Sequence, residues 1–262
     1  MVDKIILVVS FGTSYNNNRA LTIGAIEKDI DEAFPDYEMR RAFTSQMVIN
    51  KLKRRDDLDI DNVQDALERA VNDGVKTVIV QPTHVMDGTE YHFKIKDTVD
   101  KYIDKFDNIT IADPLLITDE DFEDLISSIT KDDESSDETA IVYMGHGSPA
   151  ESNMVYTKLQ SMLGEKGFDH YYIGTVEAKP DYDDVLAMVK EGDYKKIILK
   201  PLMVVAGDHA QNDMAGDEDD SWKSMFQDEG YDVDCLIEGL AQSKDIRDVY
   251  IKHVQKAIDD LS

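Results

Sequence analysis

Hydrophobic positions fall into two alternating kinds of stretch along the whole chain. Short, continuous apolar runs such as KIILVVS at 4–10 are followed by stretches in which apolar residues recur every three or four positions, as in 61–74. The first kind is typical of strands buried on both faces, and the second of amphipathic helices. Strands that alternate with helices predict parallel sheets covered by helices on both faces.

This alternation continues to the end of the chain. The expected strands lie at 4–10, 37–43, 75–82, 108–114, 140–144, 169–177, 195–205 and 233–238. The expected helices lie at 21–30, 61–74, 93–104, 119–129, 151–163, 182–191, 221–228 and 243–260. The last of these helices contains His253, which we expect on its solvated face.

A polar stretch, TKDDESSDET at 130–139, interrupts this order and has the composition of a linker. After it the order of strands and helices starts again. We therefore predict an α/β protein of two similar doubly wound parallel-sheet lobes facing a central cleft, an N-terminal lobe at 1–129 and a C-terminal lobe at 139–262.

The two halves resemble each other in three segments that follow expected strands. SFGTS at 10–14 matches GHGSP at 145–149, and RAFTSQ at 41–46 matches GTVEAK at 174–179. VIVQPTHVMDGTEYH at 78–92 matches IILKPLMVVAGDHAQ at 197–211. In open α/β sheets, ligands bind beyond the carboxyl ends of the strands, so these segments are where a site is expected.

The chemistry of the second half differs from that of the first at three of these positions: His146 replaces Phe11, Glu177 replaces Thr44, and His209 replaces Glu90. Two imidazoles and a carboxylate suit a borderline divalent metal, with coordination positions left open. Neutral imidazoles also accept protons near neutral pH. We predict a metal site in the C-terminal lobe, although a histidine after a strand is often only a hydrogen-bonded loop residue.

Further positions near these motifs are candidates for binding a ligand. Glycines at 145 and 147 would let a broad, flat ligand approach the His146 backbone. GHGSP can also hold an anion at the start of the next helix. The expected substrate-binding residues are Ser10, Gly12, Thr13, Glu90, Gly145, Gly147 and Ser148.

Composition narrows the range of partners and locations. With 55 acidic and 28 basic residues the formal net charge is −27, which repels nucleic acid and anionic membranes. The single cysteine, Cys235, excludes an internal disulfide framework. No apolar run is long enough to span a bilayer. We expect a cytoplasmic protein with no nucleic-acid or membrane partner, and a homo-oligomer stays open.

Other common sites are absent from the sequence. SFGTS is not G-x-G-x-x-G, and no acidic residue completes a dinucleotide fingerprint. There is no Walker sequence and no G-x-S-x-G nucleophile motif. NAD binding is therefore not expected.

Several motifs together resemble one known family. VVSFGTS, QPTHVMDGTEYH, MGHGSP, GTVEAKPDYDDV and KPLMVVAGDHAQNDMAGDEDDSW are similar to the anaerobic-type sirohydrochlorin cobaltochelatases, members of the class II chelatase superfamily that includes ferrochelatase. The resemblance implies a bilobal α/β fold and ATP-independent insertion of Co²⁺ into the tetrapyrrole sirohydrochlorin, on the early-insertion route of cobalamin biosynthesis. It also implies that no organic cofactor is needed. The family metal positions fall on His146, Glu177 and His209, which are then both metal ligands and catalytic residues.

Two alternatives remain open beside this reading. One is a chelatase for Fe²⁺ or Ni²⁺ on a related tetrapyrrole, because a site of two histidines and a carboxylate binds Ni²⁺ at least as well as Co²⁺. The other is a metal or tetrapyrrole carrier without turnover. In either case the substrate carboxylates need local positive charge, for which Arg19, Lys179 and Lys200 are the candidates near the motifs.

Overall fold

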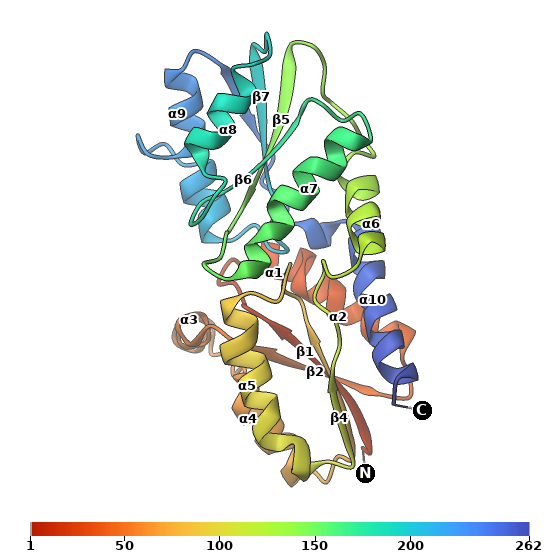
Figure 1. The fold of residues 1–262 in the computed structure, drawn as a ribbon. Helices are drawn as coiled ribbons and strands as arrows, with labels where there is room; N and C mark the ends of the chain where they lie inside the picture. The colour runs from red at the N-terminus through yellow and green to blue at the C-terminus, as the bar shows by residue number, and fades with distance from the viewer. Residues whose placement is uncertain (1, 262) are drawn as a thin grey trace. The chain divides into compact units, whose positions relative to one another are not determined.

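The computed structural model describes residues 2–261 and contains two four-stranded parallel sheets (Figure 1). The strand orders are β2-β1-β3-β4 and β6-β5-β7-β8. The strands are β1 (Lys4–Ser10), β2 (Glu38–Phe43), β3 (Thr77–Pro82), β4 (Asn108–Ile111), β5 (Thr139–Gly145), β6 (Tyr171–Thr175), β7 (Lys196–Pro201) and β8 (Asp232–Cys235). The expected α/β class and the two parallel sheets are confirmed.

The helices fill the connections between the strands. They are α1 (Asn16–Leu21), α2 (Ile23–Ala33), α3 (Gln46–Asp56), α4 (Val63–Asn72), α5 (Asp97–Val99), α6 (Asp119–Ile129), α7 (Met154–Glu165), α8 (Tyr182–Val189), α9 (Trp222–Asp228) and α10 (Lys244–Asp259). Two π-helical segments, η1 (Tyr91–Lys96) and η4 (Ala210–Met214), follow the third strand of each sheet. The remaining short segments are the 3₁₀ turns η2 (Asp100–Lys105), η3 (Glu151–Asn153) and η5 (Leu240–Gln242).

Each sheet is covered on both faces because its central strands are mostly apolar and buried. In the first sheet, β1 packs one face against α4 and the η1–α5 segment, and α2 and α10 cover the other face. In the second sheet, α8 and α9 pack on one face with Trp222 and Phe226, and α7 lies against β6 on the other. Burial of these apolar faces is the main stabilising term, at about 25 cal/mol per Å².

The chain divides into two compact units at different places from those expected. The first unit comprises residues 1–117 and 241–262, and the second comprises 118–240. Helix α10 joins the first unit because the Tyr250 hydroxyl donates to the Thr83 carbonyl and Arg247 pairs with Asp29. Helix α6 joins the second because it packs on α7 and Lys158 pairs with Asp119. The polar stretch 130–139 therefore lies inside the second unit and does not link the two.

Two details of the helices differ from the pattern-based expectation. Helix α3 was not expected, because its sequence is dominated by charges, but Val48, Ile49 and Leu52 are buried along one side. His253 on α10 was expected to face solvent and is instead buried, with its Nδ1 bonded to the carbonyl of Asp113. In both cases the packing of neighbouring elements decides burial.

The two units repeat the same register as well as the same strand order. Ser10 pairs with Phe43 in the first sheet, as Gly145 pairs with Thr175 in the second. Val9 pairs with Pro82, as Met144 pairs with Pro201. Equivalent positions can therefore be assigned residue by residue at the strand ends. Among the described residues, no helix is long and apolar enough to cross a membrane.

Candidate metal centre

The three predicted ligands come from three loops at the carboxyl edge of the second sheet. His146 follows β5 directly, Glu177 follows β6, and His209 follows β7 at the start of the helical turn that leads into η4. Each of the three offers a ligand atom, and these atoms lie within 4.8 Å of one another. Parallel strands end at the same edge of their sheet, so residues far apart in sequence meet there.

Glu177 lies between the two histidines. His146 Nε2 is 3.8 Å from Glu177 Oε2, and His209 Nε2 is 3.9 Å from Glu177 Oε1. These separations are too long for hydrogen bonds. They are close to the roughly 3.4 Å that separates two ligand atoms around a tetrahedral divalent ion. The side chains of His146 and Glu177 are about half exposed, at 48% and 55%, so the centre is open to a ligand.

Hydrogen bonds fix which ring nitrogen of each neutral histidine is free for a metal. His146 Nδ1 lies 2.8 Å from the carbonyl oxygen of Gly147, which can only accept. His209 Nδ1 lies 2.6 Å from the Asp213 carboxylate, which accepts when ionised. Both Nδ1 atoms therefore hold the proton, and both Nε2 lone pairs point to the Glu177 side.

The loops of His146 and Glu177 are joined by backbone bonds that continue the ladder beyond the strands. The Glu177 N–H donates to the His146 carbonyl at 2.9 Å, and the Val176 N–H donates to the Gly145 carbonyl at 3.0 Å. The Thr175 hydroxyl donates to the Ala178 carbonyl at 2.7 Å, which turns the chain back after Glu177. Two of the three predicted ligands thus share one hydrogen-bonded backbone frame.

The glycines beside His146 are required by packing inside the unit. A Cβ on Gly145 would lie 2.3 Å from the ring of Tyr156, which is fully buried. Gly147 has φ +88°, and a Cβ there would lie 2.9 Å from the Cβ and backbone nitrogen of Ala178. Gly145 thus makes room for Tyr156, and Gly147 lets the His146 loop approach the Glu177 loop closely. A ligand contact by these glycines stays a prediction.

Three supporting residues were not anticipated from the sequence. Asn153 accepts from the Ser148 N–H and donates to the Lys179 carbonyl, so it holds the His146 and Glu177 loops together. The Tyr156 hydroxyl accepts from the Gly147 N–H at 3.4 Å, and burial raises its pKa. Asp213 contacts His209. Of the three, only Asp213 could have been found from the sequence, because it lies four residues after His209, the spacing of neighbours on a helix.

The register of the sheets corrects one of the matched positions. The Ser45 N–H donates to the Phe11 carbonyl, as the Glu177 N–H donates to the His146 carbonyl. Glu177 is therefore equivalent to Ser45, and the expected match to Thr44 is wrong by one residue. The other two matches hold. The His92 N–H donates to the Gly88 carbonyl, and the Gln211 N–H donates to the Gly207 carbonyl in the same way. Glu90 is therefore equivalent to His209.

Most of the expected substrate-binding side chains already have partners within their own unit. Ser10 is buried, and its hydroxyl accepts from Thr83 at 2.8 Å. Thr13 accepts from the Tyr15 N–H, and Ser148 accepts from the Ala150 N–H. Their role toward a ligand stays a prediction.

Gly12 and Glu90 complete the expected set in the first unit. Gly12 has φ +96° and packs against the ring of Phe43. Glu90 is partly buried immediately before η1. Their contact with a substrate likewise stays a prediction.

The three candidate basic residues differ in how they are paired. Lys179 contacts two carboxylates, Asp181 and Asp184, and Lys200 lies 3.8 Å from Glu134. Arg19 donates to the Thr13 carbonyl at 3.1 Å and forms no ion pair within residues 2–261. Burial, followed by the nearby Arg41, lowers the pKa of Arg19, although Asp56 and Glu27 act in the opposite direction.

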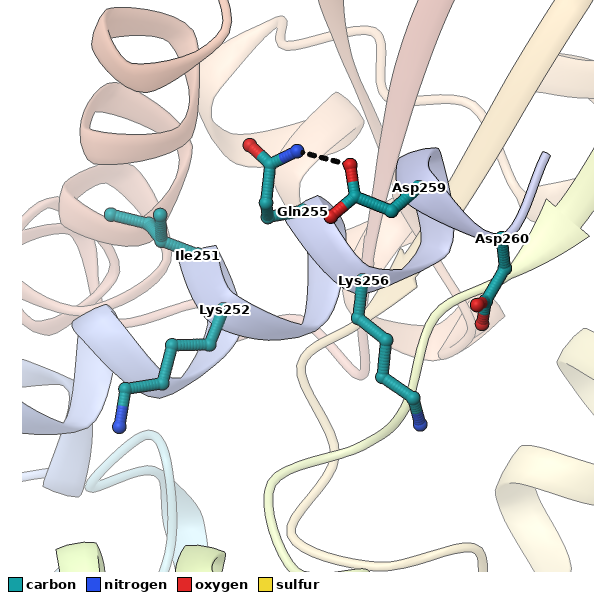
Figure 2. Close-up of a pocket in the computed structure, with 6 residues that line it drawn as sticks. All are labelled: Ile251, Lys252, Gln255, Lys256, Asp259 and Asp260. Atoms are coloured by element: carbon teal, nitrogen blue, oxygen red, sulfur yellow. Dashed lines mark hydrogen bonds between the residues drawn. The ribbon is translucent and has the colours of Figure 1, made fainter. Parts of the chain in front are cut away.

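A shallow hollow lies on α10 of the first unit (Figure 2). It is lined by Ile251, Lys252, Gln255, Lys256, Asp259 and Asp260. Gln255 donates to Asp259, and Lys256 pairs with Asp113 at 2.7 Å. None of the sequence-predicted site residues lines this hollow.

Comparison with solved structures shows the same fold. The structure of SirB from Bacillus subtilis with Fe³⁺ aligns over 99% of this chain and 97% of that chain, with a TM-score of 0.69 and 14% identity. The structure of CbiX, the terminal enzyme for biosynthesis of siroheme in denitrifying bacteria, aligns over 97% of this chain and 99% of that chain, with a TM-score of 0.56 and 14% identity.

Sequence comparison identifies the family. A sirohydrochlorin cobaltochelatase from Salmonella typhimurium is 36% identical over 259 residues, covering 98% of this chain and 97% of the relative. The sirohydrochlorin cobaltochelatase CbiKC from Nitratidesulfovibrio vulgaris is 30% identical over 271 residues, covering 100% of this chain and 93% of the relative. The model of the family described as cobalt chelatase (CbiK) matches residues 4–259, and the chain therefore belongs to the cobalt chelatase (CbiK) family.

Proposed function

We propose that this protein inserts Co²⁺ into sirohydrochlorin without ATP, as a step of cobalamin biosynthesis. The observation that supports it most is the convergence of His146, Glu177 and His209 on one point in a chain of the cobalt chelatase family. Insertion replaces two pyrrole N–H protons by one metal ion. The protein therefore has to hold the metal, release it and remove two protons.

Co²⁺ is the substrate metal, and the two Nε2 atoms with a Glu177 oxygen would hold it. Three protein ligands leave coordination positions open for incoming pyrrole nitrogens. Because both Nδ1–H groups are held by acceptors, neither ring has to rotate or change tautomer before it binds. The half-exposed side chains allow the ion to be passed on.

The same histidines are suited to accept the protons. Once a pyrrole nitrogen has displaced a histidine from the metal, the Nε2 lone pair of that histidine is free. A neutral imidazole with a free lone pair is a proton acceptor near neutral pH. The Nε2 atom thus loses its bond to Co²⁺ and gains a proton, so the positive charge of the centre stays low while Co²⁺ leaves. Glu177 faces both imidazoles and stabilises the imidazolium that forms.

Arg19 is the residue that we propose to bind a peripheral carboxylate of the tetrapyrrole. Its guanidinium is partly buried at the carboxyl edge of the first sheet, beside the loop that follows β1. It forms no ion pair among the described residues, whereas Lys179 and Lys200 each have a carboxylate nearby. Phe11 in the same loop is 50% exposed and offers an apolar surface to a flat macrocycle.

The test is an absorption assay with sirohydrochlorin and Co²⁺, corrected for the uncatalysed reaction. Many turnovers per protein support an enzyme, and a change equal to the amount of protein supports a carrier. His146→Ala, Glu177→Ala and His209→Ala are the matched inactive variants. Repeating the assay with Fe²⁺ and Ni²⁺ decides the metal, since a site of this composition does not itself favour Co²⁺ over Ni²⁺. A wild-type rate equal to the uncatalysed rate would refute the proposal.

A further inference from the structure

The two proposed histidine ligands have different partners at Nδ1. His146 donates to a neutral carbonyl of the adjacent residue, Gly147. His209 donates to a carboxylate, Asp213 Oδ2, at 2.6 Å. A carboxylate behind a metal-binding imidazole fixes the ring orientation and increases the basicity of the opposite nitrogen. The difference singles out His209 as the better supported ligand.

Asp213 has no other charged partner within residues 2–261. Elsewhere in this region, Asp181 and Asp184 share Lys179, and Asp217 pairs with Lys223. Asp213 makes one ion-pair contact, with His209, and its side chain is 45% exposed. Asp213 thus forms no ion pair with a lysine or arginine among the described residues, and it accepts from the Nδ1–H of His209. It is therefore placed to fix the orientation of that ring.

At the equivalent positions of the first unit, both members of the His209–Asp213 pair are replaced. Glu90 is equivalent to His209, and by the same register Lys94 is equivalent to Asp213. The first unit therefore has glutamate and lysine where the second has histidine and aspartate. Both pairs lie across one turn of the corresponding segments, η1 and η4. π-Helical turns often occur at functional sites, where they re-aim side chains.

We propose that Asp213 is a positioning residue for metal capture, which holds His209 in the Nδ1–H tautomer with Nε2 directed to the ion. The inference rests on the proposed role of His209 as a ligand. A surface pair of this spacing that served only the helix would contribute about 0.2–0.5 kcal/mol to stability and nothing to metal binding. The two readings therefore differ in what they predict for metal affinity.

The experiment measures binding of Co²⁺ alone, by competition with a chromophoric chelator, in the absence of any tetrapyrrole. Asp213→Ala should raise the Kd about 10- to 100-fold, the usual effect of removing such a partner. Asp213→Asn should not restore binding, because its amide can donate to Nδ1 and favour the wrong tautomer. Asp213→Glu should recover most of the affinity. Asp217→Asn, which removes one charge from the exposed acidic loop, should change the affinity for Co²⁺ less than twofold.

Two further measurements separate the possible failures. If His209→Ala binds Co²⁺ as the wild type does, the proposed metal site itself is wrong. If His209→Ala loses affinity but Asp213→Ala does not, only the role of Asp213 is refuted. Nitrogen-15 NMR of the histidine rings in the metal-free protein gives an independent readout. His209 should be protonated at Nδ1 in the wild type and lose that preference in Asp213→Asn, and an unchanged tautomer would overturn the proposal.

Discussion

The two units use one scaffold for different chemistry. At the same three strand ends, the first unit has Phe11, Ser45 and Glu90, and the second has His146, Glu177 and His209. Strand order and register are the same in both. The fold therefore brings three loops together in each unit, and the side chains on those loops decide whether a metal can be held. Function generally resides in a site placed on a fold, and the proposed metal site lies in the second unit alone.

The largest difference between the units should appear when equivalent residues are truncated. His146→Ala removes one of the three proposed ligands and should weaken Co²⁺ binding about 1,000-fold, or about 4 kcal/mol, more than the loss of an outer hydrogen-bond partner. Phe11→Ala, at the equivalent position, should leave the affinity unchanged. Equilibrium titration with Co²⁺ checks both. An equal effect of the two substitutions would mean that the units do not differ as proposed.

His84 offers a second contrast, because its equivalent in the second unit is Met203. Both ring nitrogens of His84 are buried without a hydrogen-bond partner among the described residues, and burial lowers its pKa to about 4. The unfolded chain, with a pKa near 6.5, binds the proton first as the pH falls. The contribution to stability is therefore complete above about pH 6.5 and is lost as the pH falls toward about 4.

Replacing His84 by methionine should remove this dependence. The wild type should lose about 3 kcal/mol more stability than His84→Met between about pH 7 and pH 4. Urea unfolding of both proteins across that range measures the difference. A gap between the two free energies of unfolding that stays constant with pH would show that His84 is not the group that titrates.

Gly12 and Gly147 have positive φ in the loop after the first strand of their units, and they allow a further comparison of the two units. Gly12→Ala and Gly147→Ala place a Cβ in a disfavoured conformation and against neighbouring atoms. Each should cost about 2 kcal/mol of stability. Only Gly147→Ala should also weaken Co²⁺ binding, because it pushes the His146 loop away from Ala178, next to Glu177. Thermal unfolding and Co²⁺ titration of both variants separate the two effects, and a loss of affinity in Gly12→Ala would contradict the assignment.

The smallest expected effect concerns Arg19 in the first unit. Arg19→Ala should raise the KM for sirohydrochlorin about tenfold, the size of one lost charge-assisted hydrogen bond, and leave the affinity for Co²⁺ alone unchanged. Arg54→Ala, which removes another arginine without an ion pair among the described residues, is the control. Initial rates at varied sirohydrochlorin measure the change. A rise in KM of the same size in both variants would point to net charge instead of a specific contact.

Central strands such as β1 and β5 could be predicted because their apolar runs are continuous, and the ends of β1 and α6 agree with the sequence pattern. Helix α3 escaped prediction since only three of its residues, Val48, Ile49 and Leu52, are buried among many charges. The unit boundaries also escaped, because membership of α6 and α10 depends on what each helix packs against. Such contacts are tertiary, and local patterns do not contain them.

At the candidate site, the residues proposed to bind the metal could be selected from the sequence. The residues that hold their loops in place could not. His146 and His209 stood out because the equivalent positions of the first half are chemically different. Asn153 and Tyr156 did not stand out, since their role depends on loops that the fold brings to them. The match of Glu177 to Thr44 was off by one residue because the strand ends, β6 at Thr175 and β2 at Phe43, are fixed by pairing with neighbouring strands.

The division of the chain also has a consequence for the order of synthesis. The second unit is one continuous segment, 118–240, whereas the first needs residues from 241 onward to complete it. As the chain leaves the ribosome, the unit with the proposed metal site has all its parts before the first unit receives α10. Until then the apolar side of α10, including Tyr250 and Val254, is missing from the first sheet. Folding of the second unit can therefore precede the packing of α10 on the first sheet.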